Sequence, residues 1–171
     1  RMPFSEFKGY SFWTEYQSAV SKMLDNDQSI IEDNTALNDK QRGFEMLNMK
    51  ATRDSFENLF DSEKHKSLVE KRETRLSQKA TLSALFIHLY QNEPVLNLPF
   101  QLLDSIVEID ELLTTWRYRH ALMAQRILGS KIGTGGSSGS QYLKNTTETC
   151  RVFIDFFNLP TFLIPTASVP K

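Results

Sequence analysis

The chain has 171 residues, of which 40% are hydrophobic, and a formal net charge of −1. This length can bury one sizeable core, and the near-neutral charge argues against nucleic acid and anionic membranes as partners. The single Cys150 excludes an internal disulfide framework. No apolar run approaches the roughly 20 residues that span a bilayer, so we expect no membrane segment. Since the sequence also shows no signal peptide, we expect a cytoplasmic protein.

Helical periodicity runs through the first half of the chain. Apolar residues recur at three- and four-residue spacing and predict a first helix near residues 12–24. Residues 25–40 are polar and rich in Asp and Asn, which predicts a mobile connection. A second helical pattern runs from Phe44 to Phe60, and residues 62–71 form a short charged helix at best.

Two prolines follow the next predicted helix. Ser77 is a plausible N-cap for a helix over 78–91, and Pro94 ends that element. Pro99 then stands at a first helical position, where its missing N–H has no cost.

The longest predicted helix, about 99–128, has the strongest periodicity in the chain. Its acidic residues, Asp110 among them, lie in the first half of the helix and its basic residues lie in the second half, a distribution that complements the helix dipole. Gly129 predicts the end of the helix. The apolar seam, with steps of 4,3,4,3,4,3,4, consists of Leu102, Ile106, Ile109, Leu113, Trp116, His120, Met123 and Ile127.

The end of the chain completes an all-α fold. Residues 143–157 predict another helix, stopped before Pro160, and the tail 161–171 is irregular. No alternating strand pattern occurs. We therefore predict an all-α helical bundle with one long central helix.

His120 on the apolar seam has two interpretations. A lone histidine on such a face is more often a packed core residue than a ligand, but a neutral imidazole there can also bind a metal or haem iron. Trp116 and Met123 would supply an apolar wall in either case. His65 is expected to be solvated and His88 to belong to the core, and the spacing of the histidines does not fit a zinc site.

The segment Gly133–Gly139 consists only of Gly, Thr and Ser. Such a composition is typical of a flexible linker. The sequence of the segment excludes a phosphate-binding loop, because neither of the two glycine-rich phosphate-binding motifs is present and the segment follows a predicted helix rather than a strand. Its backbone N–H groups and hydroxyls could instead line a site for a carboxylate or an ammonium group.

Several short motifs together resemble one family. The motifs are Gly9-Tyr10-x-Phe12-Trp13, Arg75-Leu76-Ser77, Pro99-x-Gln101-Leu102-Leu103, Trp116-Arg117-Tyr118-x-His120, Gly129-Ser130-Lys131-x-Gly133-Thr134-Gly135-Gly136-Ser137-Ser138-Gly139 and Phe153-x-Asp155-x-Phe157-Asn158-Leu159. The chain resembles the C-terminal half of the tryptophan 2,3-dioxygenase family. The resemblance implies an all-helical, cytosolic homotetramer that uses haem b and O₂ to convert L-tryptophan to N-formyl-kynurenine.

The resemblance also implies roles for individual residues. By this resemblance His120 is the proximal iron ligand rather than a packed core residue. Trp116 and Tyr118 would lie near the haem. Thr134 would contact the amino-acid end of the substrate, with the backbone of Gly133 and Gly135 helping. The glycine-rich loop would then be a lid that orders when the substrate arrives.

Two departures from the family pattern matter. The family's N-terminal half, with its F-Y-x-x-H-Q-type segment carrying the distal histidine and its carboxylate-binding arginine, has no counterpart here. The family usually continues its loop with Gly-Tyr-His-Tyr, whereas this chain has Gly139-Ser140-Gln141-Tyr142. Residues 1–171 are therefore interpreted as the C-terminal haem-binding portion, which is inactive without a second polypeptide, either from a nicked precursor or made separately. The alternatives are a non-catalytic relative that binds haem or a partner, and a related oxygenation of a modified indole.

Overall fold

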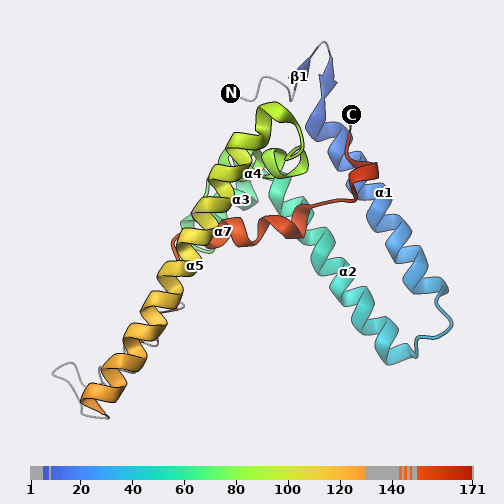
Figure 1. Cartoon of the computed structure of the whole chain (residues 1–171). Coiled ribbons are helices and arrows are strands. Elements are labelled where there is room, and N and C mark those ends of the chain that lie inside the picture. Colours follow the sequence, from blue (N-terminus) through green and yellow to red (C-terminus); the bar gives the residue numbers. More distant parts are fainter. Residues whose placement is uncertain are drawn as a thin grey trace. The chain divides into compact units, whose positions relative to one another are not determined.

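The computed structural model confirms the all-α prediction (Figure 1). It forms two compact units, one from Arg1–Tyr90 with Leu159–Lys171 and one from Gln91–Asn158. Two short strands were not predicted, β1 (Glu6–Phe7) and β2 (Tyr10–Ser11), which pair antiparallel. They are too short for an alternating pattern, and Gly9 turns the chain between them with a φ of +86°. The structure describes residues 6–7, 9–129, 143, 145, 147 and 150–170.

After these strands the first unit continues with two long helices joined by a short connection, α1 (Phe12–Asp33) and α2 (Asp39–Phe60) (Figure 1). The predicted end of the first helix at residue 24 was wrong, and so was the mobile connection over 25–40. Polar residues continue α1 on exposed positions, where Gln28 and Glu32 share a hydrogen bond of 2.9 Å. The chain leaves the helix for only a few residues, because a capping box between Asn38 and Gln41 starts α2.

Two shorter helices complete the helical part of this unit, α3 (Ser62–Glu70) and α4 (Gln78–Leu89). The Asp61 carboxylate caps α3 by accepting two backbone N–H groups. The predicted cap of α4 is confirmed, because the Ser77 hydroxyl accepts the N–H of Ala80 at 3.3 Å. Each cap satisfies N–H groups that have no partner within the helix.

Aromatic side chains from α1 and α4 form the core of the first unit. Phe12 is buried and meets Phe86 edge-on with ring centroids 4.9 Å apart. The tail packs here as well, through the 3-10 helix η1 (Leu159–Phe162), which contacts α4. A second 3-10 helix, η2 (Thr166–Ser168), follows. The hydroxyl of buried Tyr16 donates to the carbonyl of Phe162, so the tail is anchored to α1.

We expect Tyr16→Phe to destabilise the fold by about 1 kcal/mol, since it removes one buried hydrogen bond and leaves a carbonyl without its donor. Burial raises the pKa of the Tyr16 hydroxyl above its ordinary value, so the hydroxyl keeps its proton and donates throughout the neutral range. Urea unfolding of the purified protein measures the change, with Tyr10→Phe at an exposed position as the control. Equal midpoints for the two variants would show that the anchor contributes nothing.

The second unit is built on α5 (Pro94–Leu128). The predicted start at Pro99 was wrong, because Pro94 occupies the first turn, where a missing N–H is tolerated, and Pro99 lies inside the helix. The prediction of one continuous helix over 143–157 was also wrong. Residues 150–153 are not helical, and α7 spans Ile154–Phe157. No helix among the described residues is long and apolar enough to cross a membrane.

Candidate functional site

His120 lies in the last third of α5, and its side chain is half-buried. Its ring stacks on that of Trp116, one turn earlier, with centroids 5.4 Å apart and planes 9° apart. Within the part of the chain that the structure describes, the His120 ring makes no hydrogen bond. An imidazole held by stacking and free at both nitrogens can bind a metal through one of them.

The apolar seam of α5 is largely exposed around this histidine. Trp116 is 62% exposed, Met123 51% and Ile127 74%. The same holds for the residues nearer the start of the seam, Leu102, Ile109 and Leu113. A contiguous exposed apolar strip of this kind is typical of a surface that binds a ligand or another polypeptide.

A different face of α5 is covered by the second unit itself. Its four residues are Asp110, Thr114, Arg117 and Ala121, spaced 4,3,4, and Asp110 and Ala121 are fully buried. At about 100° per residue, the centre of this face lies roughly 100° around the helix from the centre of the seam. One side of α5 is therefore covered within the second unit, whereas the described side chains on the His120 side are largely exposed.

The structure brings together only part of the predicted haem set. His120 and Trp116 share a face of α5, whereas Tyr118 is exposed and lies about 160° around the helix from His120. Gly133, Thr134 and Gly135 lie outside the described residues, so their predicted role stays a prediction.

The other two histidines have structural partners. His65 is only 6% exposed, and its Nε2 lies 2.9 Å from the carbonyl oxygen of Leu76, so the prediction of a solvated side chain was wrong. The charged residues of α3 point outward while His65 occupies its buried position. His88 is half-buried, with Nδ1 2.9 Å from the Ala84 carbonyl. The described residues hold no group of three His, Cys, Asp or Glu that could bind a metal ion.

Sequence reasoning missed Asp110 as a special residue. It was interpreted as one of several acids that complement the helix dipole, yet it is buried and its Oδ1 accepts the backbone N–H of Val152 at 3.0 Å. A clue was present, because Asp110 shares its face with the small residues Thr114 and Ala121. Such a face allows close approach of another backbone.

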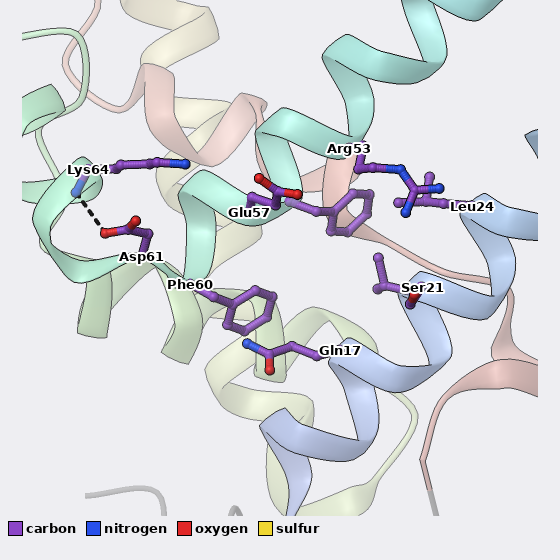
Figure 2. Close-up of a pocket in the computed structure, with 10 residues that line it drawn as sticks. Gln17, Ser21, Leu24, Arg53, Glu57, Phe60, Asp61 and Lys64 are labelled. Atoms are coloured by element: carbon purple, nitrogen blue, oxygen red, sulfur yellow. Dashed lines mark hydrogen bonds between the residues drawn. The ribbon is translucent and has the colours of Figure 1, made fainter.

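A separate groove lies in the first unit between α1 and α2 (Figure 2). Its volume is about 440 Å³, and Leu24 and Phe60 are among the apolar residues that line it. Its charged rim is partly neutralised, because the Arg53 guanidinium binds the Asp25 carboxylate at 2.8 Å. None of the residues predicted for the haem or the substrate lines this groove.

Comparison with known proteins gives a consistent result. A profile of the tryptophan 2,3-dioxygenase family matches residues 1–163. The chain is 47% identical to tryptophan 2,3-dioxygenase from Alteromonas mediterranea over 99% of this chain and 47% of that protein. Identity is 45% to the Dictyostelium discoideum enzyme and 41% to the Mus musculus enzyme, over the whole chain and 43% and 42% of those proteins. The chain thus spans less than half the length of these relatives.

Proposed function

The chain belongs to the tryptophan 2,3-dioxygenase family, and we propose that it is the haem-binding, C-terminal portion of an enzyme that converts L-tryptophan and O₂ to N-formyl-kynurenine. The observation that carries this proposal is the His120 ring, which lies on an exposed apolar face of α5, stacked on Trp116 and without a hydrogen bond to any of the described residues. The enzyme also needs the part that its relatives have beyond the matched length, and the two parts together are called the assembled protein below.

The residues around His120 fit haem b. Haem has a large apolar surface with an iron at its centre, and it needs an axial donor within an apolar wall. The exposed seam would provide that wall, and the His120 imidazole would provide the donor atom. When bound, haem supplies the activation of O₂ that the reaction requires.

Trp116 orients the proposed ligand. The stacking contact at 5.4 Å restricts rotation of the His120 ring, so that its nitrogens keep one direction relative to α5. The ring nitrogen that does not bind iron needs an acceptor, as is usual for ligating histidines. Among the described residues none accepts a hydrogen bond from this ring. Tyr118, on the other side of α5, is kept as a more distant haem neighbour.

The glycine-rich segment is the proposed substrate loop. Thr134 binds the amino-acid end of tryptophan through its hydroxyl, and the backbone N–H groups of Gly133 and Gly135 assist. This assignment is supported by the family membership and by the position of the segment directly after the helix that carries His120. A loop closing there would exclude water from the reacting groups.

We expect Thr134→Ala to weaken substrate binding by roughly 1.5–3 kcal/mol, the contribution of one hydrogen bond to a charged group. The haem content of the assembled protein should not change. Titration of the haem absorbance with L-tryptophan measures the loss, and Thr134→Ser, which keeps the hydroxyl, serves as the matched control. Unaltered binding and turnover in the alanine variant would mean that the loop is only a connector.

The exposed seam also defines the proposed assembly. Burial of Leu102, Ile109, Ile127 and their neighbours against the other part of the enzyme would stabilise both parts, at about 25 cal/mol per Å² of apolar area removed from water. That part would contribute the distal side of the haem and the cation for the substrate carboxylate. The assembled protein is proposed to be cytoplasmic and homotetramer-like, with no role for nucleic acid or membrane.

One sequence feature favours a second candidate reaction. Ser140-Gln141 replaces the Tyr-His that the family usually has after its loop, and a changed pocket could select a modified indole. Turnover assays of the assembled protein with L-tryptophan and with ring-substituted indoles separate the two reactions. Haem binding without turnover of any indole would indicate the non-catalytic relative instead.

A further inference from the structure

The buried carboxyl group of Asp110 is only half satisfied by its contact with Val152. Its Oδ1 accepts the backbone N–H of Val152 at 3.0 Å, which joins the turn at residues 150–153 to α5. The second oxygen, Oδ2, is buried and has no hydrogen-bond partner among the described residues. A carboxylate removed from water in this way is costly unless a cation and further hydrogen bonds accompany it. The position therefore calls for a positive charge nearby.

Arg117 carries a matching unsatisfied donor. It belongs to the same covered face of α5 as Asp110, and its Nη1 atom is buried and lacks a hydrogen-bond partner within the described part of the chain. The two residues are seven positions apart, which places them about 10 Å apart along the helix axis and about 20° apart around it. Since side chains of an α-helix lean toward its N-terminus, the long Arg117 side chain extends toward Asp110.

The neighbouring groups do not supply the missing contact. The Arg151 guanidinium lies over the ring of Phe157, with Cζ 4.9 Å from the ring centroid. The Thr114 hydroxyl, between Asp110 and Arg117 on the helix, donates to the backbone carbonyl of Asp110 at 2.8 Å. Both Asp110 and Arg117 are described, and no direct ion pair joins them. One water molecule can accept a hydrogen bond from Arg117 and donate one to Asp110 at the same time.

We propose that Arg117 is the counter-charge of Asp110, joined to its Oδ2 through one buried water, and that this pair holds the turn at residues 150–153 against α5. The pair gives a role to the arginine of the motif that ends in His120, which the proposed function leaves unused. Neither haem nor substrate takes part, so the inference does not depend on the proposed function. Arg117 is then not the cation that binds a substrate carboxylate.

A double-mutant cycle, followed by hydrogen exchange of the Val152 amide in the assembled protein, tests the pair. Asp110→Asn keeps an acceptor for Val152 but leaves Arg117 without its counter-charge, and Arg117→Met leaves the carboxylate unpaired. Each should speed exchange about tenfold or more, because a buried charge without a partner destabilises the turn. The double variant holds neither charge and should exchange within about threefold of the parent. Arg119→Met, at an exposed position of α5, is the matched control and should not change exchange.

Two results of the cycle would overturn the pair. One is an Arg117→Met variant that exchanges like the parent, and the other is a double variant whose acceleration equals the product of the two single effects. If Arg117→Met alone does not fold, recovery of folded protein on adding Asp110→Asn supports the pair, and continued misfolding contradicts it.

The KM for L-tryptophan gives a second readout. It should be unchanged in the double variant, whereas a raised KM in Arg117→Met with a normally protected Val152 amide would mean that Arg117 serves the substrate instead of Asp110. Exchange is measurable whether or not the preparation turns over tryptophan. A failure of the proposed function would therefore leave the test of the pair intact.

Discussion

Replacement of His120 by alanine is expected to leave the assembled protein without stably bound haem. The imidazole is the axial donor that we assign to this chain, and the stacked Trp116 has no nitrogen able to replace it. The Soret band of the purified complex should disappear, and haem content measured after extraction should fall to the background of an unrelated helical protein.

Two controls make this result specific. Arg119→Ala alters the neighbouring, exposed residue of α5 and should leave the haem content unchanged. His120→Gly with added imidazole should recover part of the Soret band, because the free imidazole can enter the vacated space. Normal haem content and an unchanged spectrum in His120→Ala would refute the assignment.

The 171-residue chain produced alone is expected to be inactive and to aggregate or bind haem loosely. The apolar side of α5 is exposed over most of its length, and contiguous apolar patches of this kind promote association. A haem bound there would also have one face open to water. Size-exclusion chromatography, haem titration and a tryptophan turnover assay on the isolated chain measure the three properties.

Co-production with a polypeptide designed to carry the family's N-terminal half should give a soluble complex that binds haem and opens the indole ring. The matched control is co-production with the same polypeptide and a chain in which Leu113 and Ile127 are changed to Glu, since two charges on the seam should prevent its burial. If the isolated chain turned over tryptophan at the rate of the complex, its catalytic groups would have to be sought among its own residues, His65, His88 and the arginines.

Helix α5 shows what periodicity predicts well. The 4,3,4 spacing of its seam was sufficient to predict a long helix that ends at Gly129, and the Ser77 cap of α4 was predicted from residue type alone. Its start was predicted five residues late, because two prolines compete for the first turn. The polar end of α1 was missed for a related reason: hydrophobic periodicity is weak where a helix has little apolar face to bury.

The site was predictable where chemistry lies on one helix, and not where it depends on tertiary contacts. His120 and Trp116 are four residues apart, so helical geometry alone places them together. The burial of His65 depends on the carbonyl of Leu76 in the following segment. The hydrogen bond between Asp110 and Val152 joins residues 42 positions apart, and short-range sequence patterns do not predict such a contact.

Turnover of L-tryptophan under ¹⁸O₂ by the assembled protein tests the central claim most directly. A dioxygenase transfers both oxygen atoms to one product molecule, so mass spectrometry of the promptly quenched reaction should show N-formyl-kynurenine carrying two ¹⁸O atoms. The same preparation with His120→Ala should give no product. A product with a single ¹⁸O atom, or no consumption of tryptophan by a complex that holds haem, would contradict the assignment of this chain to a tryptophan-opening dioxygenase.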